Sequence, residues 1–130
     1  MSIYEQYGIA PIINASGTVT RLGGAPMPQA VLDAFREAAG EWVPLDQLQA
    51  AASKRIAEIT GTEAGLATAG SAAALTVGAA AILTGLDPGR MERLPHCDGF
   101  PHEFVVAREH RSGSDHAVRA AGVKFVEVGF

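Results

Sequence analysis

The chain has little cysteine, only two lysines and no long uninterrupted hydrophobic run. A single cysteine, Cys97, excludes an internal disulfide framework and is ordinary for a protein of the reducing cytoplasm. The longest apolar stretch, residues 72–83, is broken by Thr76 and Gly78 and is too short to cross a bilayer. The first residues also lack the basic start and apolar run of a signal peptide. We therefore expect a cytoplasmic protein with no membrane partner.

An excess of positive charge is also missing. The formal net charge of the 130 residues is −4, so there is no electrostatic basis for nucleic-acid binding through phosphate contacts. With 48% hydrophobic and 18% charged residues, the composition fits at most one soluble globular domain.

Helical and extended patterns alternate along the chain. Residues 1–26 contain many Gly, Pro, Ser and Asn and predict an extended arm, which leaves 27–130 as the main domain. Periodic apolar residues predict helices over 28–40, 45–60 and 71–83, and a short helix from Ser114 to Gly122. Short apolar segments predict strands over 64–68, 103–107 and 124–128, and 90–103 is expected to be a connecting loop. This order indicates an α/β fold with a parallel sheet.

The chain stops just after a predicted strand, at Gly129 and Phe130. Three parallel strands with so few covering helices would leave apolar faces and edges exposed. We therefore expect the N-terminal part of a longer protein, and the alternative is a complete small domain.

Residues 67–81, ATAGSAAALTVGAAA, carry almost no functional side chains where a strand is expected to become a helix. Gly70 permits a tight turn, Ser71 can cap the helix or bind an anion, and Ala72 leaves the approach open. A helix N-terminus at the carboxyl end of a strand offers free N–H groups and a positive dipole end, so we predict a phosphate site. The alternative is that Ser71 is only an N-cap and the alanines only permit close packing.

Two groups of histidines deserve separate interpretations. His110 follows a predicted strand and is expected near the carboxyl edge of the sheet, where an imidazole can stack on a flat ring or accept a proton. A surface or helix-capping role is the alternative. His96, Cys97 and His102 share one loop, but their spacing matches no zinc pattern, so we expect no metal site there.

Several ordered segments together resemble the N-terminal part of a pyridoxal-phosphate enzyme of fold type I. The arm INASGTVTRLGGAPMP, the turn TAGSAAAL and the segment REHRSGSDHAVRAAGVKFVEVG carry the resemblance. It is closest to the group that contains selenocysteine synthase (seryl-tRNA selenium transferase) and D-glucosaminate-6-phosphate ammonia lyase. The resemblance covers nearly the whole chain from about Tyr7 and implies that residues 27–130 are the N-terminal, incomplete part of the cofactor-binding large domain of such an enzyme, a mostly parallel sheet with covering helices.

The resemblance also implies roles for individual residues. Gly70, Ser71 and Ala72 would hold the phosphate of pyridoxal 5'-phosphate, and His110 would stack over its ring. Asn14 to Gly17 would lie in an arm near the active site, often at the interface of a homodimer or larger homo-oligomer. The chemistry implied is carbanion stabilisation on a small amino acid or amino-sugar phosphate, followed by elimination or replacement.

Two residues that such enzymes need are missing from the matching positions. The family uses a lysine that binds the cofactor and an aspartate that pairs with the ring nitrogen. Both come later in the family pattern than these 130 residues extend. Lys54 and Lys124 do not occupy the required position, so these 130 residues alone are expected to be inactive and to contain no catalytic residue. The tRNA-binding domain of selenocysteine synthases is also missing, which favours a small substrate.

Two other functions stay open at this point. The chain could be an α/β domain of another enzyme class that binds a different phosphate ligand. It could also be a non-catalytic remnant that keeps the arm and sheet as an interaction module.

Overall fold

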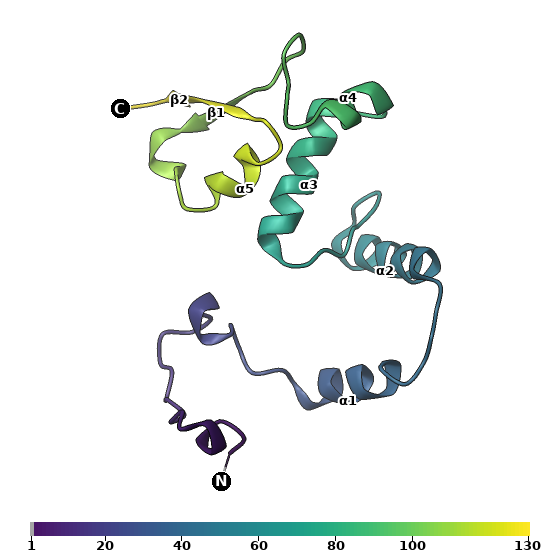
Figure 1. The fold of residues 1–130 in the computed structure, drawn as a ribbon, viewed down its shortest axis with the longest axis vertical. Coiled ribbons are helices and arrows are strands. Elements are labelled where there is room, and N and C mark those ends of the chain that lie inside the picture. Colours follow the sequence, from purple (N-terminus) through teal and green to yellow (C-terminus); the bar gives the residue numbers. More distant parts are fainter. Residues whose placement is uncertain (1) are drawn as a thin grey trace. The chain divides into compact units, whose positions relative to one another are not determined.

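The computed structural model describes residues 2–130 and has an α/β architecture (Figure 1). The chain divides into two compact units, Met1–Trp42 and Val43–Phe130, which we describe separately. Whether residues 1–26 form an arm distinct from a domain that starts at 27 stays a prediction.

The first unit contains short helical turns and one α-helix. Two 3-10 helices, η1 (Glu5–Tyr7) and η2 (Thr20–Leu22), interrupt an otherwise extended chain, in which Val19 and Gly24 form an isolated antiparallel bridge. Helix α1 (Gln29–Ala38) begins directly after Pro28, whose fixed φ suits a helix start. An extended segment followed by a helix is what the turn-rich sequence predicts.

The second unit begins with α2 (Leu45–Thr60), which ends at Gly61 as predicted. The strand predicted over 64–68 is wrong, because this segment has no strand conformation. It lies along α2 instead: Gln49 Nε2 donates to the carbonyl oxygen of Ala67 at 2.8 Å, and the Gly65 N–H donates to Ser53 Oγ at 3.2 Å. A strand needs a neighbouring strand for its backbone groups, and residues 2–130 provide none here.

Helix α3 (Ser71–Thr84) follows and is the most apolar helix of the chain that the structure describes. After it, α4 (Pro88–Arg93) replaces the first part of the predicted connecting loop. The Asp87 carboxylate accepts hydrogen bonds from the N–H groups of Gly89 and Arg90, and Pro88 occupies the first turn. An Asp-Pro pair is a helix-start signal, so this part of the loop prediction was wrong for a local reason.

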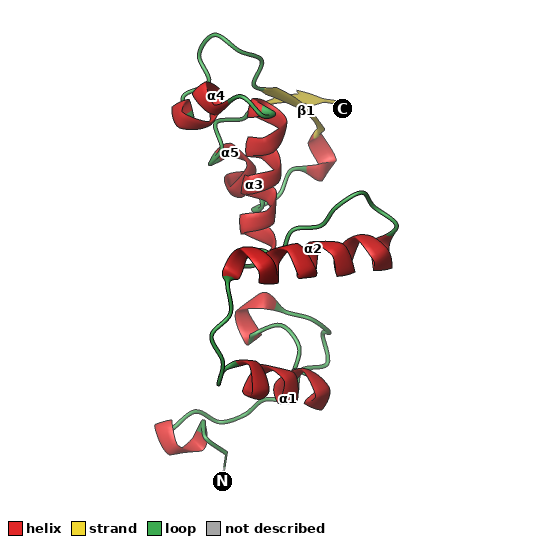
Figure 2. Cartoon of the chain, turned by 90° about the vertical axis from the view of Figure 1, so that its right-hand side faces the viewer, coloured by secondary structure: helices red, strands yellow, loops and turns green. Residues whose placement is uncertain are grey.

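The sheet of the second unit has two parallel strands, β1 (Glu103–Ala107) and β2 (Lys124–Val128). Their bounds match the predicted ranges, and the register pairs Glu103 with Lys124 and Ala107 with Val128. The connection contains η3 (Arg108–His110) and α5 (Asp115–Arg119), as Figure 2 shows from the side of the chain. Two predicted strands and their parallel pairing are thus confirmed, in a sheet smaller than expected.

The core of this unit lies between α3 and the residues that lead into the two strands. Ala79 and Leu83 of α3 form a buried cluster with four residues of the connecting segments: Cys97, Phe100, Ala121 and Val123. Nearer the start of α3, Thr76 Oγ1 donates to the carbonyl oxygen of Ala117 in α5 at 2.8 Å. The second half of α3 therefore packs at the amino ends of the strands, and its middle contacts α5. Ser71, at the start of α3, lies at the opposite end of the helix from those amino ends.

Within residues 2–130, no helix combines the length and the hydropathy that crossing a membrane requires.

Candidate functional site

The turn into α3 depends on the backbone conformation of Gly70. Its φ of 97° and ψ of 173° lie in a region that side chains other than glycine rarely adopt. No atom lies within 4 Å of the position where a Cβ would be, so the backbone angles rather than space require glycine here. Thr68 holds the turn: its carbonyl accepts from the Gly70 N–H at 2.8 Å, and its hydroxyl donates to the Gly70 carbonyl at 3.0 Å.

The first turn of α3 presents a set of hydrogen-bond donors. The first intrahelical bond runs from the Ala74 N–H to the Gly70 carbonyl at 3.1 Å. Among the described residues, the N–H groups of Ser71, Ala72 and Ala73 therefore have no acceptor within the helix. With the Ser71 hydroxyl they form a cluster of donors at the positive end of the helix dipole, which suits an anion.

The interpretation of Ser71 as an N-cap is wrong. Gly70 occupies the N-cap position, Ser71 is the first helical residue, and no side-chain cap bond forms at this end of α3. The packing interpretation of the alanines holds for only part of the run, because Ala79 is 5% exposed in the core whereas Ala72 is exposed. The small residues thus pack in the second half of α3 and leave its first turn open.

His110 lies in η3, directly after the carboxyl end of β1, and its side chain is exposed. This is the region that the sequence predicts for it. In the described part of the chain, no hydrogen bond or ion pair connects His110 with residues 70–72. The helix start and the histidine are therefore two separate elements, and their joint role at a cofactor stays a prediction.

The loop with His96, Cys97 and His102 has structural contacts. Cys97 is buried with its Sγ 3.8 Å from the carbonyl oxygen of Ala121, and His102 Nδ1 lies 2.9 Å from the carbonyl oxygen of Phe100. Across residues 2–130, no three His, Cys, Asp or Glu side chains are placed to hold a metal ion together.

The two lysines lie on β2 and α2. Lys124 Nζ forms an ion pair with Glu103 Oε1 at 2.7 Å across the two strands, and this contact lowers the pKa of Glu103. Lys54 is exposed on α2.

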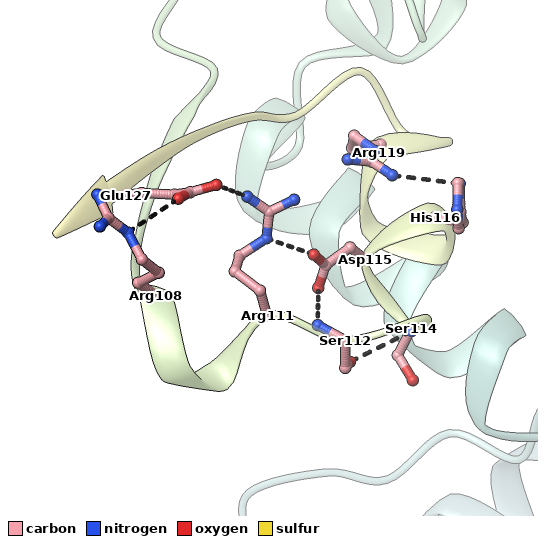
Figure 3. A network of polar contacts seen from close by, with 8 residues as sticks. All are labelled: Arg108, Arg111, Ser112, Ser114, Asp115, His116, Arg119 and Glu127. Atoms are coloured by element: carbon pink, nitrogen blue, oxygen red, sulfur yellow. Dashed lines mark hydrogen bonds and ion pairs between the residues drawn. The ribbon is translucent and has the colours of Figure 1, made fainter. Parts of the chain in front are cut away.

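The sequence interpretation missed a network of charged residues at the carboxyl ends of the strands (Figure 3). Arg111 binds the carboxylates of both Asp115 and Glu127, and Arg108 Nε lies 3.5 Å from Glu127 Oε2. Cζ of the Arg111 guanidinium also lies over the ring of Phe125, 5.1 Å from its centroid. Two arginines thus share one carboxylate on the neighbouring strand.

These contacts affect protonation. The hydrogen bond from Arg111 is the main cause that lowers the pKa of Asp115, and the Ser112 N–H adds to it by donating to Asp115 Oδ1 at 3.3 Å. The same hydrogen bond raises the pKa of Arg111. The local sequence contains the charges of the network, but the parallel register that brings Glu127 beside Arg108 and Arg111 is a non-local feature.

Comparisons with known proteins agree with the resemblance seen in the sequence. The chain is 31% identical over 132 residues to D-glucosaminate-6-phosphate ammonia lyase of Salmonella typhimurium (strain 14028s / SGSC 2262), an alignment that covers 98% of the chain and 36% of that protein. It is 33% identical over 131 residues to a 5'-C-glycyluridine monooxygenase-decarboxylase of a Streptomyces species, covering 97% of the chain and 33% of that protein.

A solved structure of a D-glucosaminate-6-phosphate ammonia lyase matches the whole chain with a TM-score of 0.94 and 30% sequence identity, and the match covers 36% of that structure. No family model matches the sequence. The chain thus spans about a third of the length of these relatives; over that third it is homologous in sequence to both, and in fold to the ammonia lyase.

Proposed function

We propose that this chain is part of a pyridoxal-phosphate-dependent lyase or transferase that acts on a small amino acid or an amino-sugar phosphate. The observation that supports this most is the similarity to D-glucosaminate-6-phosphate ammonia lyase, which extends over the whole chain in both sequence and fold. Because one homologue is an ammonia lyase, elimination of ammonia from a phosphorylated amino sugar acid is the reaction we favour.

The donor set at the start of α3 fits the phosphate group of the cofactor. Three backbone N–H groups without an acceptor in the helix lie at the start of a 14-residue helix, Ser71 adds a hydroxyl to the same turn, and the dipole there also favours a dianion. Gly70 turns the chain so that this end is accessible, and the small side chain of Ala72 leaves room for a ligand. In this proposal Ser71 and Ala72 fix the phosphate, and His110 covers the ring.

When bound, pyridoxal phosphate stabilises a carbanion at the α-carbon of an amino substrate. The residues described here would orient the cofactor by its phosphate and hold the plane of its ring. The lysine that binds the cofactor would lie outside this chain, because Lys124 is engaged with Glu103 and Lys54 is exposed on α2. A homo-oligomeric enzyme in the cytoplasm is part of the same proposal.

Cofactor trapping tests this function. The longer protein that contains this chain is purified, its absorbance is recorded with and without added pyridoxal phosphate, and borohydride is used to fix any bound cofactor. We expect a yellow protein and, after digestion and mass spectrometry, a label on a lysine other than Lys54 or Lys124. The 130-residue chain, treated in the same way, serves as the control and should carry no specific label.

Other outcomes would contradict the proposal. A colourless long form that binds other phosphate compounds would favour a different phosphate-binding enzyme. A label on Lys54 or Lys124 would show that the assignment of the cofactor-binding lysine is wrong.

A further inference from the structure

The turn that carries His110 is anchored at both of its ends to the same side chain. Arg108 precedes the pair Glu109 and His110, and Arg111 follows it. Arg108 Nε lies 3.5 Å from Glu127 Oε2, and Arg111 Nη1 binds Glu127 Oε1 (Figure 3). The backbone closes the same turn, because the Arg111 N–H donates to the Arg108 carbonyl at 3.2 Å. Glu127 therefore connects η3 to β2 on both sides of the histidine.

Arg111 is held more firmly than an isolated surface arginine. Its side chain is 26% exposed and binds Asp115 with its Nε, and its Cζ lies over the ring of Phe125. Asp115 is itself fixed by the Ser112 N–H, and its side chain is 11% exposed. A guanidinium that is bound to two carboxylates and lies over an aromatic ring has little freedom to reorient.

The charges of this cluster are balanced. Two arginines, Arg108 and Arg111, face two carboxylates, Asp115 and Glu127, so these four side chains balance one another in charge, and the nearby Arg119 adds a favourable interaction with Asp115. Both oxygens of Glu127 contact a guanidinium, which leaves it poorly placed to exchange a proton with a substrate. The arrangement suits a positioning function rather than ligand binding or acid–base catalysis.

We propose that Glu127 is a positioning residue for His110. By binding the arginines on both sides of the histidine, it fixes the position of η3 relative to β2, and η3 presents the imidazole to the cofactor ring. This inference rests on the proposed function. It assigns a role to Glu127 of β2 beside the residues proposed to contact the cofactor, which lie at the start of α3 and in η3. It also gives a reason for the polar network at this end of a small sheet.

A double-mutant cycle in the full-length, cofactor-loaded protein tests the inference. Glu127→Gln, His110→Ala and the double variant are compared by the rate of cofactor dissociation and by the circular dichroism of the bound cofactor. We expect each single change to accelerate dissociation on the order of fivefold and to weaken the cofactor band. In the His110→Ala background, Glu127→Gln should add less than about twofold, because the residue through which it acts has gone.

Glu103→Gln is the matched control, since it breaks the cross-strand ion pair at the other end of the same strands and should leave both readouts unchanged. If Glu127→Gln has its full effect without His110, or no effect with it, the positioning role is wrong while the cofactor assignment stands. If His110→Ala itself changes neither readout, the histidine does not cover the ring and the inference fails with it. If the unaltered full-length protein retains no pyridoxal phosphate, the proposed function is overturned, and the inference with it.

Discussion

The two ends of the β1–β2 pair differ in how they are stabilised. At the amino ends, Cys97, Phe100 and Val123 form the buried core with α3, and one exposed ion pair, Glu103–Lys124, joins the strands. At the carboxyl ends the chain stays open to solvent, and charged side chains connect β2 to the turn after β1. Apolar packing therefore supports one end, and a polar network supports the other.

The packed amino ends of the two strands thus contribute mainly to stability, whereas the carboxyl ends carry the residues of the proposed site. A close-packed end tolerates little change in volume, whereas an end held by directional contacts can present side chains to a ligand in a fixed geometry. In open α/β sheets, ligands bind at the carboxyl ends of the strands, which is where His110 lies. We thus expect the largest losses of stability from substitutions in the buried core at the amino ends, and changes in cofactor retention from substitutions at the carboxyl side.

The largest stability effect is expected from Gly122→Ala at the packed end. Gly122 has a φ of 102°, and an added Cβ would clash with the carbonyl of Pro95 and lie 2.6 Å from Cys97 Sγ. Strain and overpacking together should cost about 3 kcal/mol in the free energy of unfolding, measured by urea denaturation. Gly99→Ala is the control: it has a similar φ of 90° but no neighbour within 4 Å, so it should cost about 1 kcal/mol. Equal losses for the two variants would contradict the packed character of this end.

Ser71→Glu should lower cofactor retention without lowering the stability of the fold. A carboxylate in the first turn of α3 interacts favourably with the helix dipole, so stability should stay the same or rise by about 0.5 kcal/mol. Cofactor retention by the full-length protein should fall at least about tenfold, because a negative charge would occupy the position of the phosphate. Ser71→Gln, with the same length and no charge, should lose less. Full retention by Ser71→Glu would exclude the phosphate assignment.

Asp115→Asn should reveal the network through its dependence on pH. The pKa of Asp115 is lowered in the folded state, mainly by Arg111, so its ionisation stabilises the fold above the ordinary range near pH 4. That stabilisation is lost as the pH falls through the lowered pKa. The variant should therefore be less stable than the original chain at pH 7, and the difference should shrink as the pH falls below about 4, in thermal unfolding followed by circular dichroism. A difference that is constant from pH 7 to pH 3 would argue against the ion pair.

The smallest effect is expected from Glu103→Gln at the amino ends. Its ion pair with Lys124 is exposed, with side-chain exposures of 54% for Glu103 and 65% for Lys124, and solvent screens such pairs strongly. We expect no measurable change in Tm at neutral pH. Because Lys124 lowers the pKa of Glu103, the variant should lose slightly less stability than the original chain when the pH is lowered. A marked drop in Tm would mean that the two ends of the strands are not as different as their contacts indicate.

Local patterns were sufficient to predict much of the fold. The β-branched segments that became β1 and β2 and the Gly-Ser junction that opens α3 are short-range signals, and their positions were confirmed. The start of α4 is also encoded locally, in Asp87 and Pro88, within a segment whose composition predicts a loop. The segment 64–68 could not be decided locally, because an apolar stretch becomes a strand only where another strand is available to pair with it.

The candidate site divides in the same way. The position of Gly70 at a helix start followed from residue types, whereas the pairing of Glu127 with Arg108 and Arg111 depends on the parallel register of two strands. Charge alone predicts an exposed, solvated side chain for each of these residues. The contacts among them can be predicted only once the register of the two strands is known.

The hydrogen bond from Thr76 to Ala117 has a consequence for synthesis. It joins residues 41 apart, whereas the contact between Glu103 and Lys124 spans 21, so closing the longer loop costs about 0.6 kcal/mol more in chain entropy. During synthesis, the residues between the end of α3 and Ala117 take roughly 2–7 s to add. We expect this apolar helix to stay uncovered until Ala117 is free to reach it, and a chain truncated at residue 110 to be cleaved by protease within α3 much faster than the 130-residue chain. The small side chains of α3 reduce the apolar area that waits uncovered, which gives the alanine run a value during translation as well as in the folded protein.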